Sequence, residues 1–419
     1  MFSTFSSTVK FVKIYLSYAV NLYFSTFSTY LLLFIIKIYI KEGSFLPMYF
    51  KVSKKDFYNA LSVASRAISN FSPLPAFSGI KIEAKEHELV LTGSDSDVSI
   101  QTTLQKNEEC ILEINEMGSI VIEAKYILEI VRKIDAEVVE FEMIDGTLTK
   151  ISGNTAEFKI NGMRASEYPA IDFSKPQECF TIKGETLKKV ITQTSFATSD
   201  KETRPVLTGV NFSCENKTLY CVATDSYRLA KKTVEINEDL NFNITIPSKS
   251  LQEVVKTLED NFDVEVTVND KKAQFIMKNT ILQTRLIDGV YPETNRLIPL
   301  EFSYELTIDA QDLLGAIDRA SFIKSDGVSV IKFSLSEEEC VLSSRSVEVG
   351  SSMEVLNSAS FTGNSLEISC NGRYVFDALK ALNGGLVKFS LCGEMKPFIM
   401  QAIDDDSVLQ LVLPVRTYA

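Results

Sequence analysis

Three stretches of the chain decide its fold: KYILEIVRKI from Lys125, SKSLQEVVKTLED from Ser248 and GRYVFDALKAL from Gly372. Each has apolar residues spaced three and four apart, which predicts an amphipathic helix with one buried face. A basic residue stands near the start of each, at Lys125, Lys249 and Arg373, and these positions are 124 residues apart. The chain therefore contains one structural unit three times.

A second helix opens each unit, with starts at Lys54, Gly184 and Ala310. Alternating strands separated by short polar turns follow both helices in every unit. Helices and strands in this order predict an α+β fold: three tandem repeats, each with two helices packed on antiparallel sheets. A period of this length indicates tandem domains, because solenoid repeats have 20–50 residues.

Linker-like segments near Ser174-Lys175-Pro176 and Pro299-Leu300-Glu301 place the domain limits. We predict a first domain over 48–175, a second over 176–299 and a third over 300–419. Residues 1–47 do not belong to the repeat.

Residues 1–47 have two interpretations. Between Lys13 and Lys37 lie 23 uncharged residues, enough for a transmembrane helix. The composition, rich in Phe, Ser, Tyr, Leu, Ile and Lys, is also typical of translated AT-rich non-coding DNA. Lys41-Glu42-Gly43 can be encoded by a ribosome-binding sequence, so we favour a start at Met48 over a membrane anchor.

The composition excludes several classes of site. The 419 residues include one histidine, His87, which nearly excludes histidine triads and His-rich metal sites. Seven scattered cysteines without a CxxC pair indicate buried thiols in a reducing compartment.

Charge is distributed unevenly along the chain. The net charge is −12, yet the six predicted helices together carry 15 Lys/Arg against 9 Asp/Glu. Basic helices within an acidic protein are suited to holding a polyanion at one place and repelling it elsewhere. Surface helices rich in lysine are the ordinary alternative.

Three further segments carry a family resemblance: LYCVATDSYRLAKK (219–232), QTRLIDGVYPETNRLIP (283–299) and the terminal LQLVLPVRTYA (409–419). With the threefold repeat, they resemble the bacterial DNA polymerase III beta subunit, the DNA sliding clamp. The resemblance implies a homodimer of three-domain subunits that closes head to tail around duplex DNA, independently of its sequence. It implies a processivity factor without catalytic activity, cofactor or metal, in the cytoplasm at the nucleoid and not at a membrane.

The resemblance also implies partners and the pocket that binds them. The DNA polymerase III catalytic subunit, the clamp loader, other polymerases and repair proteins would insert a short hydrophobic linear motif. Its apolar anchors would enter the pocket, and arginines at a wetter rim would orient it. A Ser226-Tyr227 pair stands where Gly-His is common in the family. The pocket residues are Leu207, Thr224, Ser226, Tyr227, Arg228, Leu229, Pro292, Arg296, Leu297, Leu411, Val412, Leu413, Pro414, Val415 and Arg416. For LVLPV, a plain sheet strand is the alternative.

Two other surfaces follow from the resemblance. At the subunit interface, Phe158 and Ile160 of one subunit would face Phe322 and Ile323 of the other. A loop arginine that contacts DNA in the family is replaced here by Phe71, and Arg204 and Lys249 are better candidates. The DNA-facing residues are Lys55, Arg66, Lys125, Arg132, Lys133, Lys188, Lys189, Arg204, Lys249, Arg319 and Arg373.

Geometry agrees that one chain is too few. Six helices packed ~8–10 Å apart in a circle enclose almost nothing. Twelve give a centre-line diameter of ~35 Å and an opening of at least ~25 Å, which is wide enough for a duplex.

Two other functions are alternatives to a sliding clamp. A nuclease would need converging carboxylates, but Asp95/Asp97, Glu337–Glu339 and Asp404–Asp406 are predicted to be solvated hairpin turns. A membrane-anchored repeat protein would require the uncharged N-terminal run to be real.

Overall fold

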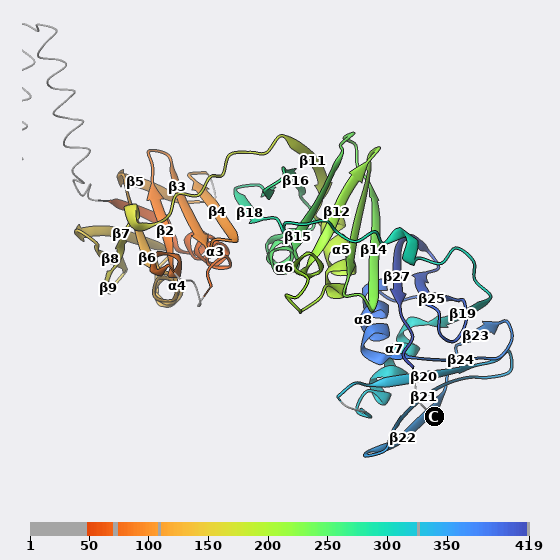
Figure 1. Ribbon diagram of the computed structural model, residues 1–419. Coiled ribbons are helices and arrows are strands. Elements are labelled where there is room, and N and C mark those ends of the chain that lie inside the picture. Colours follow the sequence, from red (N-terminus) through yellow and green to blue (C-terminus); the bar gives the residue numbers. More distant parts are fainter. Residues whose placement is uncertain (1–47, 70–73, 108–109, 325–326, 417–419) are drawn as a thin grey trace, which may run out of the picture.

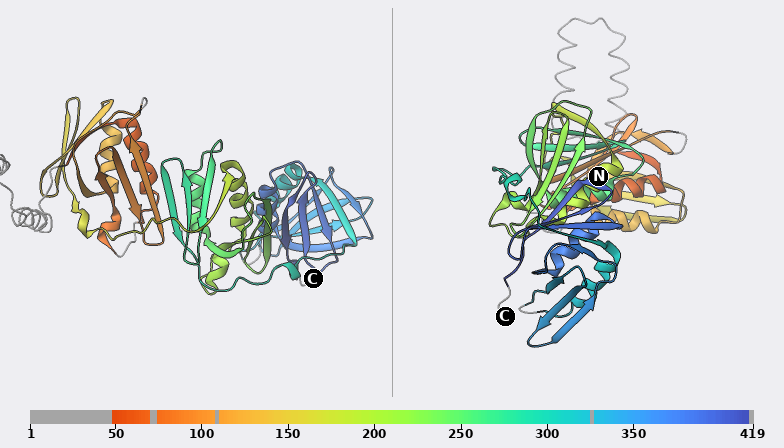
Figure 2. Two further views of the ribbon diagram at one scale, coloured as in Figure 1. Left: turned by 90° about the horizontal axis from the view of Figure 1, so that it is seen from above. Right: turned by 90° about the vertical axis from the view of Figure 1, so that its right-hand side faces the viewer.

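Three α+β units follow one another along an arc (Figures 1 and 2). The computed structural model describes residues 48–69, 74–107, 110–324 and 327–416. Residues 1–47 and Phe71 lie outside the described residues, so both interpretations of the N-terminal run stay untested. In the described ranges, no helix is both long and apolar enough to cross a membrane.

Each unit has two helices, and all six lie along the concave, lower-left side of the arc in Figure 1. Lys125, Lys249 and Arg373 are each the second residue of their helix, as the period of 124 residues predicts. Side chains cap the N-termini of α3, α7 and α8: Ser53, Asp309 and Asn371 accept hydrogen bonds from the first turn. The helices are α3 (Lys54–Ser65), α4 (Ala124–Lys133), α5 (Gly184–Thr194), α6 (Ser248–Thr257), α7 (Ala310–Ala320) and α8 (Gly372–Leu382).

Among the described residues, antiparallel strands form four sheets. The outer sheet of the first unit has the order β5 (Leu112–Glu116), β1 (Tyr49–Ser53), β7 (Val138–Asp145), β8 (Leu148–Gly153), β9 (Ala156–Asn161). The outer sheet of the third unit has the order β22 (Gly350–Val355), β21 (Cys340–Ser346), β20 (Val330–Leu335), β24 (Leu366–Asn371). Both end in an edge strand, β9 or β22, that pairs on one side only.

The two remaining sheets have nine strands each and cross the domain boundaries. The first has the order β10 (Met163–Arg164), β6 (Gly118–Glu123), β2 (Gly79–Ala84), β3 (Glu88–Ser94), β4 (Val98–Gln105), β18 (Thr280–Arg285), β17 (Lys272–Met277), β16 (Asp263–Val268), β11 (Glu178–Lys183). The second has the order β15 (Phe242–Pro247), β12 (Gly209–Glu215), β13 (Thr218–Thr224), β14 (Arg228–Glu235), β27 (Asp405–Val412), β26 (Phe398–Ala402), β25 (Leu386–Leu391), β19 (Tyr304–Asp309), β23 (Ser360–Thr362).

Strand pairing therefore joins the units. At the first junction β4 pairs with β18, and at the second β14 pairs with β27, each through five residue pairs. The apolar core also crosses the first junction, because Ala67, Val98 and Ile100 pack into the core of the second unit. The α+β fold of three repeats is confirmed, and the units form one continuous body.

Candidate functional site

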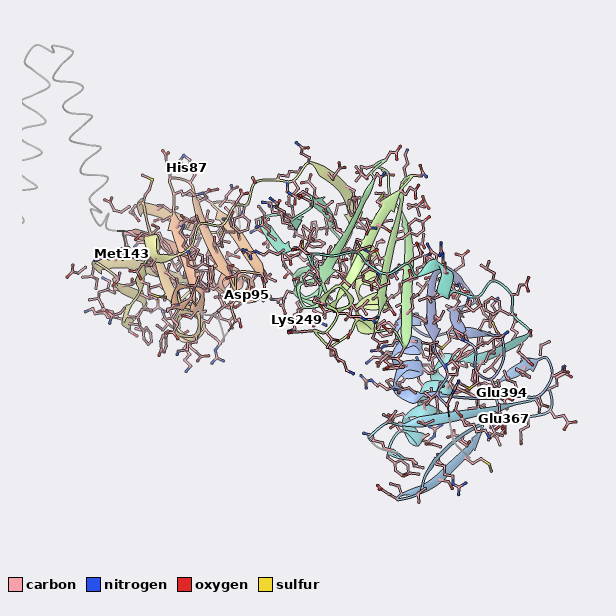
Figure 3. The ribbon with its side chains drawn as sticks, viewed as in Figure 1. His87, Asp95, Met143, Lys249, Glu367 and Glu394 are labelled. Atoms are coloured by element: carbon pink, nitrogen blue, oxygen red, sulfur yellow. The ribbon has the colours of Figure 1, made fainter. Side chains whose placement is uncertain are left out.

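The predicted DNA-facing cations gather on the concave side. Nine of the eleven lie within the six helices; Arg66 follows α3 directly, and Arg204 precedes a short 3-10 turn (Pro205–Thr208). Lys188 is half-buried and the other ten are exposed. Figure 3 labels Lys249 at the start of α6, and it places His87 on the opposite, outer side of the first unit. The structure thus places nine of the eleven cations on the six helices and Arg66 at the end of one of them.

Most of these cations are already paired with a carboxylate. Of the eleven, Lys55, Arg66, Arg204 and Lys249 have no carboxylate in ion-pair range among the described residues. Hydrogen bonding to Glu123 raises the pKa of Lys125, and hydrogen bonding to Glu185 raises that of Lys189, so both stay charged at neutral pH. The seven pairs are Lys125–Glu123, Arg132–Glu129, Lys133–Glu129, Lys188–Asp260, Lys189–Glu185, Arg319–Glu354 and Arg373–Asp377.

The predicted partner pocket begins with a tight turn between β13 and β14. Asp225 organises it: Oδ1 accepts the backbone N–H groups of Tyr227 (2.9 Å) and Arg228 (3.0 Å). Ser226 has φ of +77°, in the left-handed region where the family's glycine would be unstrained. The turn leaves Tyr227 largely exposed, so it presents an aromatic ring to solvent.

The third wall joins the turn through the backbone. β27 ends at Val412, and the N–H of Leu413 then donates to the carbonyl of Tyr227 at 2.9 Å. The N–H of Val415 donates to the carbonyl of Ser369 at 2.8 Å, which holds the tail against β24. These bonds bring the turn and the tail together. The segment that contains Pro292, Arg296 and Leu297 joins them, because the N–H of Thr224 donates to the hydroxyl of Tyr291 at 3.1 Å.

Side-chain exposure divides the predicted pocket residues into two groups. Five are buried: Leu207, Thr224, Leu229, Leu411 and Val412. Leu229 and Leu411 form an apolar floor, whereas Val412 packs into the core of the third unit. Exposed or half-buried residues can touch a ligand: Ser226, Tyr227, Pro292, Arg296, Leu297, Leu413, Pro414, Val415 and Arg416. Sequence reasoning missed the rest of the floor, where Val222 and Ile399 pack with Leu229 and Leu411 beneath Tyr291 and Ile298. The apolar residues within β13 and β26 were the sequence feature that could have predicted Val222 and Ile399 as part of the floor.

Arg228 corrects the sequence-based prediction of a rim arginine. Its side chain points into the junction between the second and third units, where Nη1 contacts Asp377 Oδ2 of α8 at 2.9 Å and Nε contacts Asp225 at 3.0 Å. The Tyr374 and Phe196 rings lie 4.6 and 5.3 Å from the guanidinium carbon. Arg228 therefore supports the pocket from inside the junction, and Arg296 is an exposed arginine beside it.

The first junction repeats the backbone of the pocket without its apolar side chains. There Ser96 has φ of +88°, and the N–H of Arg285 donates to the carbonyl of Asp97 at 2.9 Å. The cross-strand pair that is Leu229 with Leu411 at the second junction is Ser99 with Gln283 at the first. The fold therefore does not require leucines at this position, which favours a binding role over a purely structural strand.

The predicted interface residues also divide. Phe158 and Ile160 lie on the edge strand β9 with exposed or half-buried side chains, and Phe322 is 67% exposed. Ile323 is only 2% exposed because it is buried in its own unit. This corrects the prediction for Ile323, which has no surface to offer a second subunit.

The acidic clusters lie at hairpin turns, as predicted. Asp95/Asp97 lie between β3 and β4, and Glu337–Glu339 lie between β20 and β21. Asp404 lies in the turn between β26 and β27, whereas Asp405 and Asp406 are the first two residues of β27. Asp405 is more than a solvated turn residue, because it pairs with the buried Lys232 of β14 at 3.2 Å across the second junction. In the described ranges, no group of three or more His, Cys, Asp or Glu side chains could hold a metal ion.

Family models match the chain in three parts. The models describe the DNA polymerase III beta subunit: its N-terminal domain matches residues 48–172, its central domain 181–293 and its C-terminal domain 295–416.

Individual relatives agree with these matches. The beta sliding clamp of Bacillus subtilis (strain 168) is 39% identical over 378 residues, covering 88% of this chain and 100% of the relative. A Staphylococcus aureus (strain N315) beta sliding clamp is 39% identical over 377 residues with the same coverage.

Solved structures share the fold. The crystal structure of the Bacillus subtilis DNA polymerase sliding clamp superposes with a TM-score of 0.85 at 38% identity, covering 88% of this chain and 100% of that one. A sliding clamp from Bartonella birtlesii, crystallised bound to griselimycin, gives 0.82 at 26% identity with the same coverage.

Proposed function

The chain belongs to the DNA polymerase III beta subunit family, the bacterial sliding clamps, and on that premise we propose how its own residues close the ring, face DNA and bind partners. It is a DNA sliding clamp: a non-catalytic processivity factor that encircles duplex DNA and tethers the replicative polymerase. The domain limits 48–175, 176–299 and 300–419 and the residue roles below are part of the proposal.

Two edge strands support head-to-tail closure. Both junctions inside the chain pair the last strand of one unit with the edge strand of the unit before it, β18 with β4 and β27 with β14. The strands in the equivalent positions are β9 of the first unit and β22 of the third, and each has one free edge among the described residues. We propose that β22 of one subunit pairs with β9 of the other, so that a twofold axis uses this interface twice. Phe158, Ile160 and Phe322 would supply its apolar contacts.

The concave helices would face the duplex. Because seven of the eleven DNA-facing cations share their charge with a carboxylate, direct contacts to phosphate would be weak and sequence-independent. Lys55, Arg66, Arg204 and Lys249 would supply the strongest contacts. Weak contacts inside a closed ring permit sliding without release, and such a protein would work in the cytoplasm at the nucleoid.

Partner proteins would bind at the second junction. The DNA polymerase III catalytic subunit, the clamp loader, other polymerases and repair proteins would insert a motif with a glutamine and a hydrophobic tail. The apolar anchors would lie against Leu413, Pro414 and Leu297, with Tyr227 forming one side. The contrast between the apolar pair Leu229 and Leu411 at the second junction and the polar pair Ser99 and Gln283 at the first supports one pocket per subunit.

The free edges of β9 and β22 are the observation that carries the ring proposal. A comparison of circular with linear DNA tests it. The protein loaded on nicked circular DNA should stay bound through gel filtration and should be lost when the circle is linearised, because a ring escapes only at a free end. Equal retention on the circle and on the linear form would mean binding by contact and would contradict a closed ring.

A further inference from the structure

A single carboxylate, that of Asp377 in α8, serves two arginines that belong to different surfaces. Its Oδ2 accepts from Nη1 of Arg228 at 2.9 Å. Nε of Arg373 lies 2.9 Å from Oδ1 and 3.1 Å from Oδ2 of the same carboxylate. The side chains of Arg228 and Asp377 are 12% and 14% exposed, whereas that of Arg373 is 73% exposed. The shared negative charge thus connects a buried arginine with a solvent-facing one.

The buried arginine is part of the frame of the pocket turn. Asp225 binds the Arg228 side chain through Oδ2 and the backbone of Tyr227 and Arg228 through Oδ1. The carbonyl of Tyr227 in turn accepts the N–H of Leu413. Any change in how firmly the guanidinium of Arg228 is held is therefore passed to Tyr227 and Leu413, two side chains that line the pocket.

The exposed arginine belongs to the concave surface. Arg373 is the second residue of α8, the position that Lys125 and Lys249 hold in α4 and α6. A phosphate near α8 attracts its guanidinium, and a guanidinium that turns to phosphate leaves Asp377. The charge of Asp377 then acts on Arg228 alone, and in a site this poorly exposed to water that pair becomes stronger.

We propose that Asp377 is a positioning residue for the partner pocket, and that through it DNA inside the ring tightens the binding of a partner peptide. The proposal rests on the proposed function and adds a regulation to it. Because coupling between two binding sites is reciprocal, a bound peptide also strengthens the hold of Arg373 on phosphate by the same factor.

The test measures peptide affinity with and without DNA. A fluorescent peptide of the Gln-x-x-Leu-Phe type with uncharged flanks is titrated with the full-length protein, alone and with a saturating short linear duplex at low ionic strength. We expect the duplex to lower the peptide Kd roughly three- to tenfold, the lower part of the usual range for coupled sites. Arg373→Gln should give the tighter Kd without DNA and abolish the response to DNA. Asp377→Asn should bind the peptide more weakly in both states, again without a response.

Lys249→Gln is the matched control. Lys249 has the same helix position as Arg373, but no carboxylate lies in ion-pair range of it among the described residues. The variant should bind DNA more weakly, yet its peptide Kd should still fall when the duplex saturates it. A wild-type Kd that does not respond to DNA overturns the coupling alone. If the peptide Kd of Lys249→Gln also fails to fall when duplex is added, as in Arg373→Gln and Asp377→Asn, the role of Asp377 is overturned. A peptide that does not bind the free protein overturns the pocket itself.

Discussion

Phe322 and Ile323 are neighbours in the chain with opposite surroundings. Aligning the starts of α3, α5 and α7 places Ile323 in register with Ala67 and Ala197, and all three side chains are buried. The position that Ala67, Ala197 and Ile323 occupy is therefore part of the core in every unit. The sequence contained that signal in its own repeat, but the apolar pair alone suggested two surface residues.

Truncating these two side chains separates core from interface. Ile323→Ala should destabilise the third unit by about 2–5 kcal/mol, because it opens a cavity in a packed site. Phe322→Ala should leave the thermal unfolding of the subunit nearly unchanged and shift the dimer toward monomer. Calorimetry and sedimentation velocity on both variants check this, and a dimer unaffected by Phe322→Ala would remove that residue from the interface.

The ion pair of Lys232 and Asp405 predicts an acid-sensitive second junction. Burial raises the pKa of Asp405, but hydrogen bonds from Ser407 and Lys232 outweigh it, so the pKa is lowered. A lowered folded-state pKa contributes stability that is present above the unfolded value, near 4, and is lost as the pH falls through the folded value. Asp405→Asn should therefore flatten the pH dependence of the melting temperature below about pH 4. An unchanged acid limb would mean that this pair does not stabilise the junction.

At the scale of elements, the end of β27 has two roles in consecutive residues. Leu411 and Val412 complete a nine-stranded sheet and are buried, so deletion from Leu411 onward would remove part of the junction as well as the pocket. Leu413 and Pro414 lie beyond the strand and are half-buried. The sheet-strand interpretation of LVLPV is thus confirmed for Leu411 and Val412, and the pocket interpretation stays a prediction for Leu413, Pro414 and Val415.

The double change Leu413→Ala and Pro414→Ala should abolish most peptide binding. Loss of two anchors costs ~2–4 kcal/mol, or roughly 30- to 1000-fold in Kd, while the melting temperature should change little. Arg285→Ala is the matched control, because the N–H of Arg285 makes the equivalent bond at the first junction. It should bind the peptide as the wild type does. A lower melting temperature with unchanged peptide affinity would make the pocket assignment wrong.

At the scale of the whole molecule, the periodicity of apolar residues predicted the features that depend on residues close together in the sequence. The repeats and the six helices followed from spacing within short windows, and the family resemblance supplied the pocket segments. The inward direction of Arg228 and the pairing of Lys232 with Asp405 could not be predicted, because each depends on partners more than 140 residues away. The continuous sheets were missed for the same reason: a junction strand has the same alternation as any other strand.

The charge of the whole chain sets an expectation for salt. Residues 1–47 carry four Lys and one Glu, so the net charge of −12 becomes −15 from Met48 onward. Attraction to phosphate should therefore come from the proposed DNA-facing cations and should weaken steeply with salt. Once loaded on circular DNA, the protein should resist salt that releases it from linear duplex, as measured by co-migration over a salt series. Equal release from circles and linear DNA would contradict enclosure.

The strand pairing across the two junctions makes the subunit stiff, because backbone hydrogen bonds join each unit to the next. A polymerase bound at the proposed pocket would pull on the five residue pairs that join β14 to β27, and their backbone hydrogen bonds would share the force. A flexible linker would first have to be drawn taut, whereas these paired strands would pass a pull to the neighbouring units without slack. An enzyme moving along DNA would then pull the ring with it at the same speed, and the orientation of the ring relative to the enzyme would stay fixed.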